Sequence, residues 1–169
     1  MGGQPTTEVL TRELVRLLND LVAMHGELVM LANQKLEAMK RADTNQIASI
    51  TAREMVLVKR LTEREGLRRQ ITRKILINLD ITDRVKEPVR LAELAEYLQE
   101  PRRSELLSVA AGLKKKVQEM EDMRVTTTLV TQEMLKHLRA ILSAMTNGDP
   151  GMETYGRTGQ RQKGGAAHV

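Results

Sequence analysis

Two side chains with the spacing of a metal site, Glu133 and His137, stand four positions apart in the second half of the chain. On a helix this spacing places a carboxylate and an imidazole on one face, where both can bind a metal ion. No second pair completes such a site, and the chain has no cysteine. No glycine-rich phosphate loop follows a strand pattern either. We therefore expect no metal, no cofactor and no enzymatic activity.

Positive charge is the second chemical feature, because residues 53–74 hold eight basic and three acidic residues. Such a density of charge is typical of surfaces that bind nucleic acid. However, no aromatic side chain is interleaved to stack on bases, and the three glutamates favour a solvated helix face with i,i+4 ion pairs. We favour the solvated face and expect no nucleic acid as a partner. Strong, salt-dependent retention on DNA would support the alternative.

Tyr155 is the third feature, one of two tyrosines in a chain without Phe or Trp. It follows the break at 147–151 and stands among glycines, in Tyr-Gly-Arg-Thr-Gly. An aromatic residue in such a segment cannot be a core residue of a helical protein. Its amphipathic ring buries much area for little lost rotamer freedom, which is typical of an interface anchor. The alternative is that Tyr155 folds back over the open end of a helix bundle.

A strict 4-3-4-3 spacing predicts one long helix over about residues 101–145. Its members are Leu106, Ala110, Leu113, Val117, Met120, Arg124, Thr127, Thr131, Met134, Leu138, Ile141 and Met145. This face is apolar at both ends and polar in the middle. It must therefore pack against other helices or hold a helix from a partner.

The remaining patterns predict an all-α fold, an elongated antiparallel three-helix bundle or coiled coil with a flexible C-terminal tail. The expected segments are a flexible N-terminus at 1–6, a helical bundle at 7–145 with helices at about 7–41, 44–79 and 101–145 and a short helix at about 90–99, and a disordered Gly-rich tail at 146–169. At ~1.5 Å per residue the last helix is the longest, and we expect it to extend past the hairpin of the first two.

Polar and small residues inside the helices carry two further expectations. Four charged residues fall on or near the inner face of the second helix: Glu54, Arg64, Glu65 and Arg68. A charge buried there must be paired. Three glycines, Gly26, Gly66 and Gly112, fall inside predicted helices, where each costs up to ~1 kcal/mol relative to alanine. We interpret them as marks of close contacts between helices.

Composition limits the compartment. The chain lacks cysteine, no run approaches the ~18 apolar residues that a membrane span needs, and the N-terminus lacks the regions of a signal peptide. We therefore expect a cytoplasmic protein without a membrane span.

With these elements placed, the chain resembles the FlgN family of flagellar export chaperones over about residues 8–160. Three features carry the resemblance: residues 50–57 with Leu61, Arg68 and Arg69, the last helix running into a Gly/Pro-rich break, and the Tyr155–Gln160 box within residues 153–160. One departure is that Arg124 and Thr127 (or Val125 and Thr128) stand where family members often carry two asparagines. The polar layer is kept without the amides.

The resemblance implies a type III export chaperone that binds hook-associated (hook–filament junction) proteins, prevents their premature association and delivers them to the export gate and its ATPase complex. The apolar end of the last helix would then bind the client through Met134, Leu135, Leu138, Ile141, Leu142 and Met145. In the family the tyrosine of the C-terminal box contacts the export gate. That role would fall on Tyr155, Gly156 and Gly159.

The alternative function is structural. A coiled-coil protein without an export role would use the same apolar stripes to pair with copies of itself. A mass measurement at several protein concentrations separates the two.

Overall fold

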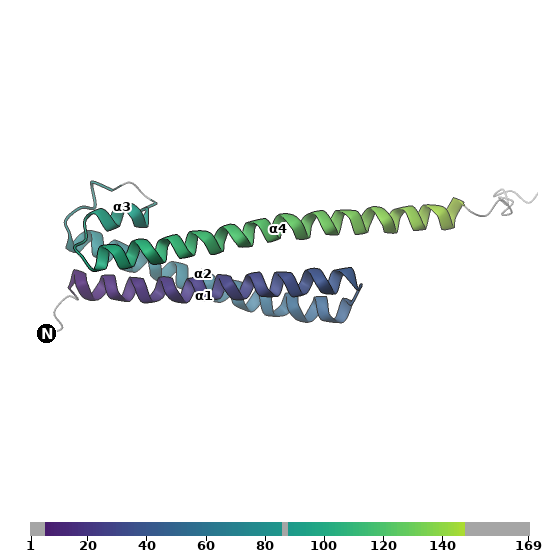
Figure 1. The fold of residues 1–169 in the computed structure, drawn as a ribbon, viewed down its shortest axis with the longest axis horizontal. Coiled ribbons are helices and arrows are strands. Elements are labelled where there is room, and N and C mark those ends of the chain that lie inside the picture. Colours follow the sequence, from purple (N-terminus) through teal and green to yellow (C-terminus); the bar gives the residue numbers. More distant parts are fainter. Residues whose placement is uncertain (1–5, 86–87, 148–169) are drawn as a thin grey trace, which may run out of the picture. The chain divides into compact units, whose positions relative to one another are not determined.

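Four α-helices make up the part of the chain that the structure, a computed structural model, describes: residues 6–85 and 88–147. They are α1 (Thr7–Lys40), α2 (Thr44–Asn78), α3 (Leu91–Glu96) and α4 (Arg102–Asn147). No strand occurs within these ranges, so the all-α prediction is confirmed (Figure 1). The predicted N-terminal segment, except Thr6, and the tail from residue 148 onward lie outside the described residues.

Capping residues determine where the hairpin of α1 and α2 begins and turns. The Thr6 hydroxyl accepts a hydrogen bond from the Val9 N–H at 3.4 Å, and the Asp43 carboxylate accepts one from the Gln46 N–H at 3.0 Å. Between the helices, the Asp43 N–H donates to the Ala38 carbonyl at 3.0 Å, while Ala42 takes a φ of 54°. This is the Schellman arrangement, and it satisfies the last carbonyls of α1 within three residues.

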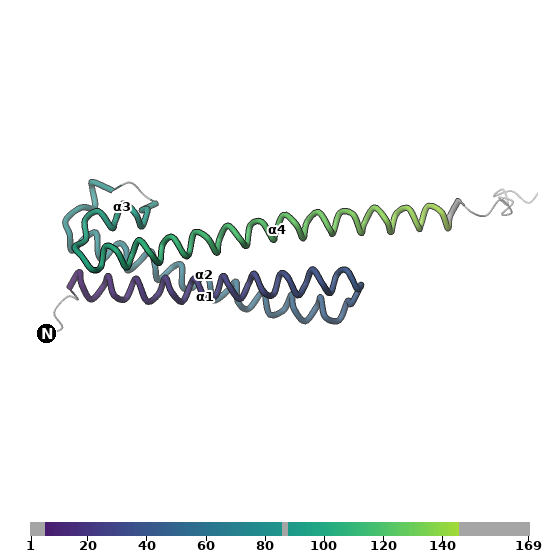
Figure 2. Tube along the Cα trace, viewed as in Figure 1, coloured from purple at the N-terminus to yellow at the C-terminus, as the bar shows by residue number. Residues whose placement is uncertain are grey.

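The chain reverses direction twice within residues 6–130. α1 and α2 lie side by side, and the connector that holds α3 lies at the end where α1 begins and α2 ends (Figures 1 and 2). α4 starts at this same end, where the Arg102 guanidinium lies 3.5 Å from the Glu8 carboxylate of α1. α1 and the first part of α4 therefore run parallel, and α2 runs antiparallel to both, as the prediction of an antiparallel bundle requires.

The core divides into two groups of buried side chains. The first gathers five leucines of α1, three residues of α2, the connector residues Ile81, Val85 and Leu98, two residues of α3, and Leu106 of α4. The second lies nearer the hairpin turn and joins Leu28, Leu31 and Ala38 of α1 to Ile50 and Leu57 of α2, with Met120 of α4 packed against it. α4 therefore contributes to the first group with its first turns, and among its described apolar residues Met120 packs against the second group.

Charged residues at the α1–α2 interface are paired, as the sequence required. Lys35 of α1 donates a 2.6 Å hydrogen bond to Glu54 of α2, and both side chains are mostly buried. Arg64 of α2 lies 3.5 Å from Asp20 of α1. Arg68 instead pairs with Glu65 on its own helix at 2.8 Å. Two of these pairs cross between helices and help to set the register of the hairpin.

The interpretation of the helix glycines is wrong. A methyl group added at Gly26, Gly66 or Gly112 would meet no atom within 4 Å. None of the three therefore marks a close approach of two helices. Nothing in the structure explains the choice of glycine at these positions.

The chain divides into two compact units, residues 1–130 and residues 131–169, and the boundary between them falls within α4. In the first unit its side chains Val109 and Leu113 pack against the core. Arg124, at the polar middle of the predicted seam, is exposed and pairs with Glu121 one turn earlier. The second unit is described from Thr131 to Asn147, all of it helical.

Candidate functional site: an apolar stripe on α4

Residues 131–145 carry one apolar stripe, and its side chains are largely exposed. Leu135 is 46 % exposed, Leu138 54 %, Ile141 56 % and Met145 73 %. Met134 is half-buried and Leu142 is exposed. At ~100° per residue these six side chains fall within about 120° of arc on α4. Leucine and isoleucine are usually buried in soluble proteins, so a contiguous exposed row of them indicates an interaction surface.

The other face of the same segment is polar and charged. Lys136 donates a hydrogen bond to Glu133, and this bond lowers the pKa of the Glu133 carboxylate. Gln132 and His137 are exposed. An apolar stripe opposite a charged face is the pattern of a helix that pairs with another helix.

The candidate metal pair has no further ligands. Glu133 is engaged by Lys136, and no group of three or more ligating residues occurs among residues 6–85 and 88–147. His25 of α1 is half-buried, and its Nδ1 lies 2.8 Å from the Leu21 carbonyl oxygen. This contact stays within α1. No described helix is long and apolar enough to cross a membrane.

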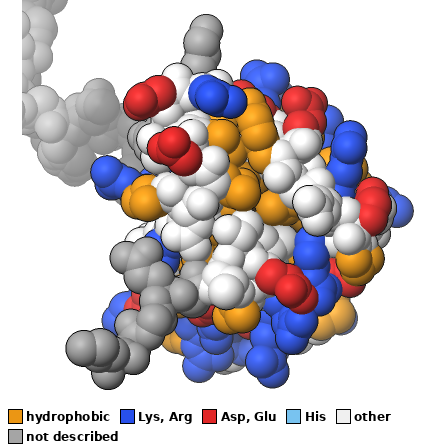
Figure 3. Space-filling model, turned by 90° about the vertical axis from the view of Figure 1, so that its left-hand side faces the viewer, with side chains coloured by type: hydrophobic (Ala, Val, Ile, Leu, Met, Phe, Trp, Pro, Cys, Tyr) orange, Lys and Arg blue, Asp and Glu red, His pale blue; other side chains and the backbone are white. Residues whose placement is uncertain are grey.

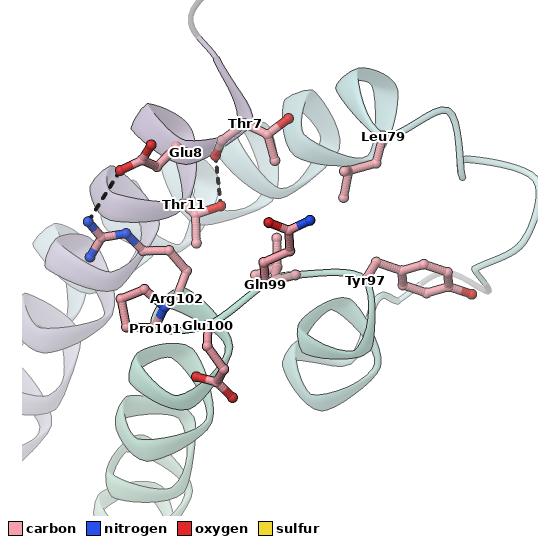
Figure 4. A pocket seen from close by; sticks show the side chains of 10 residues that line it. Thr7, Glu8, Thr11, Leu79, Tyr97, Gln99, Glu100, Pro101 and Arg102 are labelled. Atoms are coloured by element: carbon pink, nitrogen blue, oxygen red, sulfur yellow. Dashed lines mark hydrogen bonds and ion pairs between the residues drawn. The ribbon is translucent and has the colours of Figure 1, made fainter.

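A pocket of about 410 Å³ lies where α1, α2, the end of α3 and the start of α4 meet (Figure 4). The Arg102 guanidinium contacts Glu8 of α1 at 3.5 Å and donates to Glu105 at 2.6 Å, and the bond to Glu105 raises the pKa of Arg102. Thr11 donates to the Thr7 carbonyl at 2.8 Å. The Arg102 guanidinium thus pairs with both carboxylates, and its contact with Glu8 links the first turn of α4 to α1.

Sequence reasoning did not find a second pocket, of about 260 Å³, beside the C-terminal half of α2. Its lining combines five residues of α2 with two residues of the connector: Arg68, Arg69, Thr72, Arg73, Leu76, Pro88 and Val89. The sequence signal was the basic run itself, which we interpreted as a solvated face. The missing element was the connector after α2, whose position beside this helix only the tertiary structure provides.

The three residues of the predicted export-gate site, Tyr155, Gly156 and Gly159, lie outside the described residues. The structure therefore places only the client-binding part of the predicted site, on one face of one helix.

These features define a class: a helical protein with an apolar stripe on its last long helix and no catalytic constellation in the described part. The sequence matches the family model described as FlgN protein over residues 1–163. The chain belongs to the FlgN family, and its general role is that of a flagellar export chaperone. No curated protein and no solved structure matches the chain.

Proposed function

We propose that this FlgN-family chaperone binds hook-associated proteins, those of the hook–filament junction, along the stripe of α4. The observation that carries the proposal is the exposed apolar row of Leu135, Leu138, Ile141 and Met145. Each such side chain gains ~1.5–3 kcal/mol when it is fully buried. An amphipathic helix of the client, laid along the stripe, would bury its own apolar face at the same time. Covering that face keeps the client from associating prematurely.

The test is the double variant Leu138→Asp/Ile141→Asp. Two carboxylates in the middle of the stripe must lose their hydration when a client helix covers them, so affinity for the junction proteins should fall by orders of magnitude. Calorimetry with purified junction protein measures the affinity, and circular dichroism measures the fold. The matched control is Gln132→Asp/Ala140→Asp, which adds the same two charges on the other face and should bind normally. Global unfolding of the first variant would show that the stripe is core.

Self-association through the same stripe is the rival function. Sedimentation at several concentrations of the chaperone alone separates the two functions. The proposal expects the purified junction protein to form a complex with the chaperone. A stable homo-oligomer that the junction protein leaves intact would favour a structural coiled-coil protein instead.

We further propose that Tyr155, with Gly156 and Gly159, contacts the export gate or its ATPase complex and does not bind the client. The support is the glycine-flanked aromatic in the sequence and the family resemblance of the box around it. A chaperone that delivers a client to this machinery acts before export, so we place it in the cytoplasm.

Tyr155→Ala tests this second step, with client binding and gate binding measured separately. Client affinity should stay within a few-fold, while gate binding and secretion fall. The matched control is Tyr97→Ala, at the other tyrosine, which lines the pocket between α1 and the start of α4. Equal loss of client and gate binding in Tyr155→Ala, or a large drop in its melting temperature, would show that Tyr155 is structural.

A further inference from the structure

The small pocket beside α2 combines free positive charge with a buried polar atom that has no partner. Arg69 and Arg73 are exposed, lie one turn apart, and make no ion pair or hydrogen bond within residues 6–85 and 88–147. Thr72, between them in sequence, is only 3 % exposed, and among the described residues its Oγ1 has no hydrogen-bond partner. Buried hydroxyl groups are nearly always hydrogen-bonded, because losing water without a replacement is costly.

Arg68 adds a third guanidinium, held in place by its neighbour. Its Nε and Nη2 donate to the Glu65 carboxylate at 2.8–3.0 Å, and its side chain is 16 % exposed. This pair neutralises one of the three positive charges. The guanidinium groups of Arg69 and Arg73 and the Thr72 hydroxyl are hydrogen-bond donors without an acceptor among the described residues. An oxyanion supplies the oxygen atoms that such donors require, and planar guanidinium groups bind it with two parallel hydrogen bonds.

The apolar part of the lining bears on the kind of oxyanion that fits. Leu76 of α2 and the connector residues Pro88 and Val89 also line the pocket, so a ligand that fills it contacts apolar atoms as well as guanidinium groups. A nucleic-acid backbone would need a long basic track and aromatic side chains for stacking, and no tyrosine lines this pocket. Figure 3 views the end where α1 begins, and there apolar side chains lie in the middle with Lys, Arg, Asp and Glu side chains around them.

We propose that this pocket binds a carboxylate side chain from a partner protein, in a segment that also presents an apolar residue. The carboxylate accepts hydrogen bonds from Arg69, Arg73 and the Thr72 hydroxyl, while the apolar neighbour packs against Leu76 and Val89. The pocket volume of about 260 Å³ holds one or two side chains. The site lies within residues 1–130, and it stands or falls independently of the stripe on α4.

Nuclear magnetic resonance on the full chain tests the site with two probes. The first is a blocked Leu-Glu-Glu-Leu peptide with its glutamine counterpart, and the second is inorganic phosphate. The acidic peptide should shift the signals of residues 68–76, and the glutamine peptide should not. Phosphate should bind more weakly, because it lacks the apolar part. Equal affinity for phosphate and the acidic peptide would reduce the pocket to an adventitious ion site and overturn the proposal.

Two variants connect the binding to the named groups. Arg69→Gln/Arg73→Gln should weaken peptide binding about tenfold or more, since it removes the charged donors. Its matched control is Arg53→Gln/Arg60→Gln, which removes the same charge from exposed positions of α2 outside the pocket and should change affinity less than twofold. Equal weakening in both double variants would show a general charge effect.

Thr72→Val removes only the hydroxyl and keeps the shape of the side chain. It should weaken peptide binding several-fold while the melting temperature stays the same or rises, because the variant removes a buried group that lacks a partner. A lower melting temperature with unchanged peptide affinity would show that Thr72 serves folding alone and would overturn its part in the site.

Discussion

At the scale of single residues, backbone conformation and residue type do not match in several places. Ala42 and Asp80 adopt φ values of 54° and 55° at the ends of α1 and α2. This left-handed region suits glycine, is tolerated by aspartate, and strains other residues with a Cβ such as Ala42. The helix-interior position 66, in contrast, is glycine with open space around it. The chain therefore places glycine where it weakens a helix and alanine where glycine would relieve strain.

Two substitutions in opposite chemical directions should both raise stability. Gly66→Ala should add up to ~1 kcal/mol, because alanine favours the helix and meets no atom within 4 Å. Ala42→Gly should add ~0.5–1 kcal/mol by relieving the left-handed strain. Urea denaturation followed by circular dichroism measures both. Ala48→Gly, at an exposed position inside α2, is the control and should lower stability. A loss in Ala42→Gly similar to that in Ala48→Gly would contradict the role of the turn.

At the scale of elements, α4 is supported by local ion pairs along its polar face. Lys116 pairs with Glu119 at 2.7 Å, Arg124 with Glu121 at 2.6 Å, and Lys136 with Glu133. In each pair the hydrogen bond from the basic side chain lowers the pKa of the glutamate. Ion pairs between residues three positions apart stabilise a helix without help from other helices.

These pairs predict the pH range in which helix content changes. A glutamate whose pKa is lowered in the folded chain stabilises it above the ordinary value of about 4.5. This stabilisation is lost as the pH falls through the lowered folded value. Circular dichroism should therefore show constant helix content from about pH 7 to 5 and a decline below about pH 4.5, smaller at high salt. Glu119→Gln/Glu121→Gln/Glu133→Gln should lose part of this decline. A fall between about pH 7 and 6 would instead indicate a histidine.

At the scale of the whole molecule, the two units differ in what their apolar side chains do. In residues 1–130, leucines of α1 such as Leu14 and Leu18 are fully buried among all four helices and the connector. In residues 131–147, the apolar row is exposed on a single helix. The first unit therefore has a buried apolar core, whereas the proposed client site of the second unit is exposed. We therefore expect substitutions in the two units to separate stability from binding.

Leu14→Ala and Leu135→Ala form the matched test. Leu14 is fully buried, so its truncation should lower the free energy of unfolding by about 2–5 kcal/mol through lost burial and a cavity. Leu135 is 46 % exposed, and its truncation should change stability by less than ~0.5 kcal/mol. Urea denaturation measures both variants, and calorimetry with the junction protein should show weaker binding only for Leu135→Ala. A large stability loss in Leu135→Ala would place Leu135 in a core.

The sequence by itself determined the helices, the hairpin and the stripe, because these depend on local periodicity and capping. Leu10, Leu14, Leu17 and Leu21 follow a 4-3 seam and are buried. The stripe from Met134 to Met145 follows the same spacing, but spacing alone does not separate a core face from a binding face. The structure adds that Leu135, Leu138, Ile141 and Met145 are exposed on this helix, which spacing alone does not tell. Only the tertiary structure shows that Arg69 and Arg73 line a pocket, because the connector residues Pro88 and Val89 lie beside this face of α2.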